Sequence, residues 1–465
     1  MSKVKEFHPF ELNSERIPQA FLMKEISFPK HFYIKTMGCQ MNAYDSDSLA
    51  QAMIKDGISP VNTPENADII LLNTCAVRAK PEQKAYSFLG RMFSIKKENP
   101  DLILGVIGCL AQMKALELIK RFPEIDFILG PRELGRFQEV LKTVEIDHGR
   151  IVAAGSNPAP LRPEHGKGYF EKRVAGYVSI MEGCNNFCSY CIVPYVRGRE
   201  ISRSPHEILI EVENLLTAGI KEITLLGQNV NSYLWDGRDK KWNFRVLLDE
   251  LSRLDRLLRL RFTTSHPKDL SDDLIHSFHD IRKLCPHIHL PFQAGSNRIL
   301  KLMRRGYTRE AYLELIKKLR QVKPGIAITS DVMVGFPGEM DEDFELTLDL
   351  LRNVEFDSLF SFKYSDRSGT SAEAMNNKIR DSVKAARLSV LQDLQKEITL
   401  KKNKELEGKR LEVLVEGKSK RGGQLTGRTV SNKVVNFNGN NSLIGSLVTV
   451  NIKRSFLNSL RAELT

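Results

Sequence analysis

Short apolar runs alternate with amphipathic stretches in the first third of the chain. The runs at residues 32–37, 68–73, 102–108 and 125–129 have the length and composition of buried strands. Between them, residues 45–55, 82–97 and 112–121 carry apolar positions at helical spacing. This alternation predicts an N-terminal parallel α/β domain over residues 31–147. Residues 1–30 show no such pattern and are assigned to an N-terminal extension.

The same alternation returns after a linker, residues 148–172, which is rich in glycine, proline and charge. Helical segments separate six further apolar runs, and these predicted strands are residues 176–181, 222–226, 259–263, 287–290, 327–334 and 358–364. Six βα units in about 200 residues are fewer than a full eightfold barrel contains. We therefore predict an open partial (β/α)6 barrel in a domain of residues 173–401.

The last part of the chain changes character. A charged helical connector at residues 382–406 leads to β-branched runs at 411–415, 424–437 and 446–454, which glycine and asparagine turns separate. This pattern predicts a small all-β, OB-like barrel over residues 402–465. The overall fold class is α/β, with this β-barrel appended.

Charge and hydropathy narrow the choice of partners and location. No run of 18 apolar residues occurs, and residues 1–30 lack the apolar centre of a signal peptide, so we expect a cytoplasmic protein without a membrane partner. The formal net charge is +12, and from Lys409 onward ten Lys/Arg face three acids, a local net of +7. Such a cluster indicates contacts with phosphates, although a solvated basic face is the simpler alternative.

Three of the seven cysteines lie within eight positions, at Cys184, Cys188 and Cys191. The C-x3-C-x2-C spacing after a predicted strand lets one loop hold three corners of a cubane iron–sulfur cluster. A structural zinc site needs a fourth ligand, and the sequence nearby shows none. Three thiolates leave one iron open for chemistry. This loop and the partial barrel after it resemble the radical S-adenosylmethionine superfamily.

Cys39, Cys75 and Cys109 each follow a predicted strand of the first domain. The carboxyl ends of parallel strands share one edge of the sheet, so these thiols are expected to converge although they are far apart in sequence. Three inert buried thiols are the alternative. Cys285 is expected to be a plain buried thiol.

Further motifs extend the resemblance over nearly the whole chain after residue 31. The motif residues are 36–42, 73–78, 180–184, 192–200, 226–233, 263–267, 289–296, 329–331 and 334–339. They resemble the methylthiotransferase family, and within it the tRNA 2-methylthio-isopentenyladenosine synthases. The C-terminal barrel resembles the TRAM domain, which binds tRNA.

The resemblance implies two 4Fe–4S clusters, one on Cys184, Cys188 and Cys191 and an auxiliary one on Cys39, Cys75 and Cys109, together with S-adenosylmethionine. It also implies conversion of N6-isopentenyladenosine at position 37 of tRNA to its 2-methylthio derivative, by a radical that abstracts hydrogen from C2. The residues expected to bind S-adenosylmethionine and the base are Gln228, Asn229, Ser265, His289, Gln293, Asp331 and Glu339. Ordinary packing or capping is the alternative for each.

The implied partners are the tRNA anticodon loop, an electron donor such as flavodoxin or ferredoxin, and a supplier of sulfur or clusters. The residues expected to follow RNA phosphates are Lys409, Arg410, Lys418, Lys420, Arg421, Arg428, Lys433, Lys453 and Arg454. Phe437 or Phe456 is expected to stack on bases. Three alternatives stay open: modification of threonylcarbamoyl-adenosine in tRNA, modification of a ribosomal protein, and a non-catalytic RNA-binding iron–sulfur protein.

Overall fold

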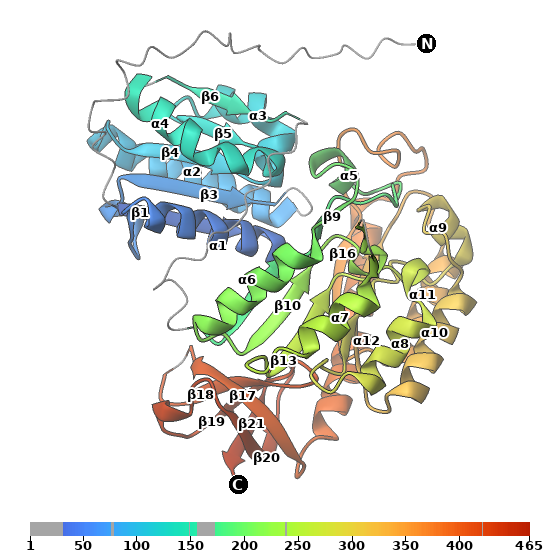
Figure 1. The fold of residues 1–465 in the computed structure, drawn as a ribbon. Coiled ribbons are helices and arrows are strands. Elements are labelled where there is room, and N and C mark those ends of the chain that lie inside the picture. Colours follow the sequence, from blue (N-terminus) through green and yellow to red (C-terminus); the bar gives the residue numbers. More distant parts are fainter. Residues whose placement is uncertain (1–30, 76–78, 148, 156–172, 238–239, 421) are drawn as a thin grey trace. The chain divides into compact units, whose positions relative to one another are not determined.

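The apolar runs of the first two predicted domains form strands of three parallel sheets (Figure 1). The computed structural model describes residues 31–75, 79–147, 149–155, 173–237, 240–420 and 422–465. The N-terminal extension, most of the expected linker and Arg421 lie outside the described residues. The chain divides into two units, residues 1–166 and 167–465. None of the described helices is long and apolar enough to cross a membrane.

The first unit contains a six-stranded parallel sheet in the order β2-β1-β3-β4-β5-β6. The strands are β1 (His31–Met37), β2 (Ser59–Pro60), β3 (Ile69–Thr74), β4 (Ile103–Ile107), β5 (Phe127–Leu129) and β6 (Ile151–Ala153). The helices are α1 (Gln40–Lys55), α2 (Ala79–Glu98), α3 (Cys109–Arg121) and α4 (Phe137–Asp147). Because every residue of β3 is buried, this strand forms the middle of the core.

Four of these strands confirm the predicted α/β domain, and two were not expected. Strand β2 is two residues long. Strand β6 lies in the segment assigned to the linker and pairs in parallel with β5, with Val152 opposite Ile128. The N-terminal sheet thus extends past residue 147.

The second unit begins with the partial barrel. Its strands are β7 (Ala175–Ser179), β10 (Glu222–Leu226), β13 (Arg259–Thr263), β14 (His287–His289), β15 (Ala327–Val334) and β16 (Ser358–Lys363). They form two parallel sheets, β7-β10-β13 and β14-β15-β16. A parallel bridge between Leu260 and Leu284, with the Cys285 amide donating to the Leu260 carbonyl at 2.9 Å, joins β13 to the segment before β14. The predicted open six-stranded barrel is confirmed.

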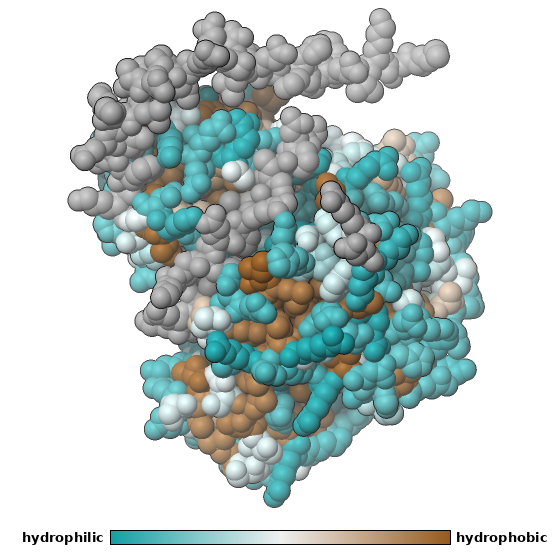
Figure 2. All heavy atoms as spheres, in the orientation of Figure 1, coloured by the Kyte–Doolittle hydropathy of each residue, from teal (hydrophilic) through white to brown (hydrophobic). Residues whose placement is uncertain are grey.

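Helices connect and cover these strands. They are α6 (Pro205–Thr217), α7 (Phe244–Ser252), α8 (Asp272–Asp280), α9 (Asn297–Leu302), α10 (Arg309–Val322) and α11 (Asp341–Val354). Their apolar stripes enter one core with the strands, and Leu248, Leu319 and Leu351 are fully buried there. Hydrophilic side chains cover the outer surfaces of α8, α10 and α11 (Figure 2). This division of faces is the one expected of amphipathic helices around a sheet.

The long helix α12 (Asp381–Lys404) leads into a closed β-barrel with the strand order β17-β18-β19-β21-β20. Its strands are β17 (Arg410–Lys418), β18 (Leu425–Thr429), β19 (Val434–Phe437), β20 (Leu447–Ser455) and β21 (Leu460–Leu464). The predicted single run at 424–437 is two strands with a turn between them, and β21 was not predicted. Phe437 is completely buried in this barrel, so the expectation that it stacks on bases is wrong.

Two buried arginines on β13 attach the β-barrel to the amino-terminal end of the partial barrel. Arg261 pairs with Glu222 at 2.9 Å and donates to the carbonyls of Thr429 and Val430, each at 2.9 Å. Arg259 reaches the carbonyl of Arg428 at 2.6 Å and the carboxylate of Glu412 at 3.0 Å. The turn after β18 therefore lies at the mouth of the partial barrel that is opposite the carboxyl ends of its strands.

Arg261→Ala is expected to destabilise this second unit by about 3–5 kcal/mol, since it leaves the Glu222 carboxylate buried without its cation. Arg253→Ala is the control, because Arg253 is 71% exposed and its ion pair is with the nearby Glu250. Chemical denaturation followed by circular dichroism measures both changes. Equal stabilities for the two variants would contradict the anchoring role of Arg261.

Candidate active site

The cysteine triplet lies in a folded loop after β7 and the short strand β8 (Met181–Glu182). Gly183 begins the loop with φ +75°, and a Cβ atom there would lie 2.1 Å from the carbonyl oxygen of Arg199. The Cys184 amide donates to the Gly198 carbonyl at 3.2 Å, and the Cys191 amide donates to the Cys188 carbonyl at 2.9 Å. Only glycine at position 183 permits this close return of the chain.

The three thiols affect one another electrostatically. Burial raises the pKa of Cys191 to about 12, and the neighbouring Cys188 and Cys184 add to this effect. Burial also raises the pKa of Cys184, again with a contribution from Cys188. Cys184 and Cys191 thus lie in one poorly solvated loop, within electrostatic reach of Cys188. A metal cluster replaces the protons of such thiols on binding.

Arg305 is a buried cation at this loop that the sequence analysis missed. Its Nη1 lies 3.4 Å from the sulfur of Cys188, and its Nη2 donates to the Pro291 carbonyl at 2.8 Å. Tyr307, within hydrogen-bond distance of Arg305 Nε, donates to the Phe292 carbonyl at 2.8 Å. Arg305 is only 5% exposed, so its guanidinium lies beside the Cys188 sulfur inside the protein. Sequence gives little sign of this contact because most arginines lie at the surface.

The carboxyl ends of the barrel strands hold buried polar atoms that lack a hydrogen-bond partner within the described structure. These atoms are Gln228 Oε1 after β10, Ser265 Oγ after β13, Gln293 Oε1 after β14 and Asp331 Oδ1 on β15. A buried polar atom without a hydrogen-bond partner costs free energy. Such an atom therefore indicates a place where a polar ligand supplies the missing partner. The structure thus brings four of the predicted binding residues to one end of the barrel.

His266, next to Ser265, belongs to the same end of the barrel and was also missed. Its Nε2 is buried without a partner among the described residues, and its Nδ1 accepts from the Lys268 amide at 3.2 Å. Burial, with added effects of Arg305 and Lys268, lowers the pKa of His266 to about 2. The imidazole is therefore neutral, and its Nε2 hydrogen is available to a ligand. Its place in the motif at 263–267 was the available signal.

The remaining predicted residues make contacts within the protein. Asn229 donates to Asp269 at 2.7 Å and accepts from the His266 amide at 3.1 Å. The Glu339 carboxylate binds the Gly335 amide at 2.8 Å and Arg387 at 2.6 Å. These contacts favour positioning roles for Asn229 and Glu339.

His289 lies between two neighbours on β15. Its Nδ1 is 3.1 Å from Thr329 Oγ1, and its Nε2 is 3.6 Å from Asp331 Oδ1. The side chain is 12% exposed, so a small part of the imidazole remains accessible.

The three N-terminal cysteines follow adjacent strands of the first sheet. Strands β1 and β3 pair with Met37 opposite Thr74, and β3 and β4 pair with Asn73 opposite Ile107. Cys39, Cys75 and Cys109 come one or two residues after these positions, at the carboxyl edge of the sheet. The structure therefore brings the three chain segments together as the sequence predicts.

Glycine and asparagine support this edge. A Cβ atom on Gly38 would lie 2.9 Å from Cys75 Cβ, and one on Gly108, where φ is +93°, would lie 2.7 Å from the Thr74 carbonyl. Asn42 accepts from the Cys39 thiol at 3.2 Å and donates to Asn73 at 2.7 Å. The two asparagines, which the sequence analysis did not select, fix the segments that carry Cys39 and Cys75.

Both triads supply three thiols, the donor type that iron–sulfur clusters use. Within the described residues, no three Cys, His, Asp or Glu side chains stand close enough to hold one metal ion. Three thiols on closely packed loops, with glycines where a side chain would collide, provide the donor set that a 4Fe–4S cluster needs.

The basic residues of the β-barrel fall into two groups. Lys409, Arg410, Lys418 and Lys420 are exposed, whereas Lys453 pairs with Glu463 at 3.1 Å and Arg454 lies over the ring of Phe456. Arg428 pairs with Glu416 at 3.1 Å, and Lys433 pairs with the buried Asp357 at 3.2 Å. Arg428 and Lys433 thus stabilise the fold, and Arg421 lies outside the described residues.

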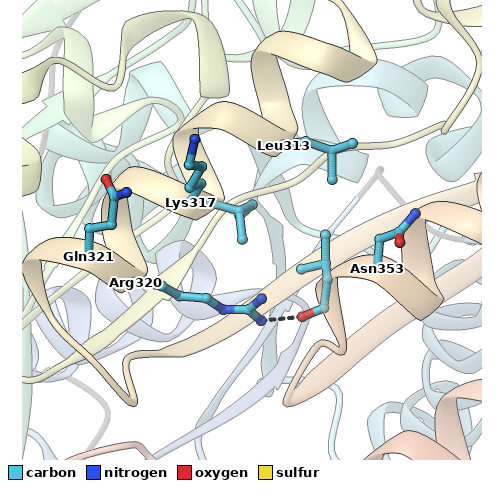
Figure 3. A pocket seen from close by; sticks show the side chains of 7 residues that line it. Leu313, Lys317, Arg320, Gln321 and Asn353 are labelled. Atoms are coloured by element: carbon cyan, nitrogen blue, oxygen red, sulfur yellow. Dashed lines mark hydrogen bonds between the residues drawn. The ribbon is translucent and has the colours of Figure 1, made fainter.

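A shallow pocket between α10 and α11 lies outside the barrel interior (Figure 3). Its lining residues are Leu313, Ile316, Lys317, Arg320, Gln321, Asn353 and Val354. Arg320 crosses it and donates to the carbonyl of Val354. With neither a thiol nor a carboxylate in its lining, this pocket is not the candidate active site.

Family models match three parts of the chain. The radical SAM superfamily matches residues 178–351, Uncharacterized protein family UPF0004 matches residues 31–130, and the TRAM domain matches residues 404–465. Among solved structures, the radical S-adenosylmethionine methyltransferase TsrM from Kitasatospora setae is similar with a TM-score of 0.54 and 16% identity, over 74% of each chain. This likeness supports the fold alone.

Relatives with much higher identity carry one name, tRNA-2-methylthio-N(6)-dimethylallyladenosine synthase. The protein of Syntrophus aciditrophicus is 50% identical over 94% of each chain. The protein of Carboxydothermus hydrogenoformans is 47% identical over 94% of this chain and 99% of its own. Together with the two cysteine triads at the ends of parallel strands, this similarity shows that the chain belongs to the tRNA-2-methylthio-N(6)-dimethylallyladenosine synthase family of radical SAM proteins.

Proposed function

We propose that this protein converts N6-isopentenyladenosine at position 37 of tRNA to 2-methylthio-N6-isopentenyladenosine. The observation that carries the proposal is the pair of cysteine triads, each at the carboxyl ends of parallel strands in its own unit. The triad in the second unit would hold the cluster used to form the radical. The triad in the first unit would hold the cluster that delivers the sulfur. A protein that only binds RNA has no need of two such sites.

The cofactors supply the chemistry that protein side chains lack. When bound, two 4Fe–4S clusters and S-adenosylmethionine supply a methylated sulfur and a radical that is strong enough to remove an aromatic hydrogen. We propose Cys184, Cys188 and Cys191 as ligands of one cluster and Cys39, Cys75 and Cys109 as ligands of the other.

The barrel residues would bind and orient the other reactants. Ser265 and Gln228 would form hydrogen bonds to S-adenosylmethionine through their buried polar atoms. Gln293, after β14, and Asp331, on β15, would do the same. The neutral His266 would donate from Nε2. In each case a buried group without a partner gains one when the ligand binds.

The remaining assignments follow from this chemistry. An electron donor such as flavodoxin or ferredoxin, and a supplier of sulfur or clusters, would be needed for repeated turnover. A reducing cytoplasm would keep the six proposed cluster ligands as thiols. We propose the boundaries 31–147, 173–401 and 402–465 for the three domains, with β6 as an addition to the first.

Mass spectrometry of tRNA nucleosides from cells that lack this protein tests the proposal. The 2-methylthio-isopentenyl nucleoside should disappear while N6-isopentenyladenosine accumulates, and the wild-type gene should restore the profile. If only a threonylcarbamoyl nucleoside changes, or no nucleoside changes, the proposed substrate is incorrect.

The exposed basic residues of the TRAM barrel are expected to contribute affinity without sequence preference. Lys418→Ala combined with Lys420→Ala should make the slope of log Kobs against log salt concentration shallower by about one unit per lysine. The preference for one tRNA over another should change little. Lys317→Ala, which removes one exposed positive charge from α10, is the control. Binding titrations at several salt concentrations measure the slopes. An unchanged slope for the double variant would remove these lysines from the RNA surface.

A further inference from the structure

A buried arginine lies beside the cysteine loop without a carboxylate partner. Arg305 is 5% exposed, and none of its contacts within the described residues is an ion pair. Three other buried arginines of this unit, Arg259, Arg261 and Arg387, each pair with a glutamate, at 3.0, 2.9 and 2.6 Å. A buried guanidinium without an anion costs free energy, so Arg305 indicates a place where a bound group supplies negative charge.

The hydrogen bonds of Arg305 direct one of its nitrogens to a proposed cluster ligand. Nη2 donates to the Pro291 carbonyl at 2.8 Å, and Nε donates to the Tyr307 hydroxyl at 3.3 Å. Because the guanidinium is planar and its donors form a rigid fork, these two bonds fix the direction of the third nitrogen. That nitrogen, Nη1, donates to the sulfur of Cys188 at 3.4 Å.

The turn that carries Arg305 is also bonded to the cysteine loop through its backbone. The Ser189 amide donates to the Met303 carbonyl at 3.0 Å, and the Ser189 hydroxyl donates to the Leu302 carbonyl at 2.8 Å. Ser189 follows Cys188 directly in the chain. Backbone and side chain together therefore hold the cation at the Cys188 sulfur.

A cation in this position favours the reduced form of a cluster. Reduction transfers one electron from the donor to the cluster, and no bond of the protein forms or breaks. The cluster and its thiolate ligands become more negative in this step, so an N–H···S hydrogen bond to a ligand strengthens. Burial increases the effect, because little water screens the charges.

We infer that Arg305 raises the reduction potential of the cluster held by Cys184, Cys188 and Cys191, through its positive charge and its hydrogen bond to Cys188. This inference rests on the proposed function, which places a cluster on these thiols. Arg305 is a positioning residue, because it acts through a cluster ligand and takes no part in bond making.

The carboxylate of S-adenosylmethionine is another anion that a guanidinium binds, most strongly as a bidentate pair. Each of the three nitrogens of Arg305 already donates to an acceptor in the protein. This arrangement disfavours the bidentate pair and favours the cluster as the source of negative charge.

Potentiometric titration of the anaerobically reconstituted holoenzyme with dithionite, followed by electron paramagnetic resonance, tests the inference. The transition that Cys188→Ala removes belongs to this cluster, and the auxiliary cluster is the internal reference. At the potential that half-reduces the wild type, Arg305→Met should lower the ratio of reduced to oxidised cluster about tenfold, a shift of about 59 mV to lower potential. Arg305→Lys, which keeps the charge, should recover part of the shift, and the auxiliary transition should not move.

Tyr307→Phe is the matched control, because it removes a hydroxyl that contacts Arg305 and keeps the cation. Its midpoint should equal that of the wild type, and a shift as large as that of Arg305→Met would assign the effect to packing and overturn the inference. The iron content of each variant measures cluster occupancy. If Arg305→Met loses iron, Arg305→Gln replaces it as the neutral variant, and its midpoint should lie below that of Arg305→Lys.

The KM for S-adenosylmethionine distinguishes the two anions and should be the same in all these variants. An unchanged midpoint with a raised KM would assign Arg305 to the carboxylate of S-adenosylmethionine and overturn the inference. Loss of this cluster from every Arg305 variant would also overturn it, because the cation would then be required for binding of the cluster. A shifted midpoint, in an enzyme whose wild type makes no methylthio product from RNA containing N6-isopentenyladenosine, would reject the proposed substrate and leave the inference standing.

Discussion

Replacement of Cys184, Cys188 or Cys191 by alanine is expected to abolish both cleavage of S-adenosylmethionine and methylthiolation. Three thiols on one loop are the only protein donors that we assign to this cluster, so no neighbour can substitute for a lost one. Loss of a ligand should also remove about four irons per chain, because the cluster is a cubane. The iron content and the 5′-deoxyadenosine yield of anaerobically reconstituted protein measure the two effects.

Cys285→Ala is the matched control for this series. Cys285 is 3% exposed, and burial raises its pKa to about 11, so it is a packed thiol of low reactivity. This variant should keep all iron and full activity. If Cys285→Ala loses as much iron as Cys188→Ala, or if Cys188→Ala still cleaves S-adenosylmethionine, the ligand assignment is wrong.

Much of the fold was predictable because its parallel strands are buried on both faces. Strand β3 is an unbroken buried run, and such runs are visible without any knowledge of neighbours. Strand β6 has three residues, one of them exposed, and its pairing depends on β5 of the completed sheet. Strand β21 likewise alternates buried and exposed residues and completes a barrel that local sequence does not reveal.

The candidate site was predictable where topology decides position, and less so where contacts do. Cys39, Cys75 and Cys109 follow parallel strands, so the sheet alone brings them to one edge. Asn229 and Glu339 are polar residues in the expected places, yet their partners Asp269 and Arg387 are visible only in the fold.

Arg305 could not be selected from the sequence. More than a hundred residues separate it from Cys188, and only the packed barrel places the guanidinium at the sulfur. Arg428 and Lys433 look like phosphate ligands in sequence, whereas the structure pairs them with Glu416 and Asp357. The charge of a side chain is evident from sequence, but its partner is set by tertiary structure.

The second large effect separates the two triads. Alanine at Cys39, Cys75 or Cys109 is expected to stop methylthiolation, while RNA-independent cleavage of S-adenosylmethionine continues. The physical reason is that these thiols lie on the first sheet, in a different unit from the loop of Cys184, Cys188 and Cys191. These variants should also lose about four irons per chain, the content of one cubane.

A suitable control for this series is Asn42→Ala, which removes the acceptor of the Cys39 thiol but leaves all six proposed ligands in place. It should retain part of the iron and part of the methylthio product, since Asn42 orients Cys39 rather than binding iron. Product analysis after RNA digestion, run beside 5′-deoxyadenosine quantification, gives both readouts from one reaction. Continued methylthiolation by Cys75→Ala would show that the sulfur does not come from this triad. Equal loss of cleavage in both cysteine series would mean that the two triads form a single functional site.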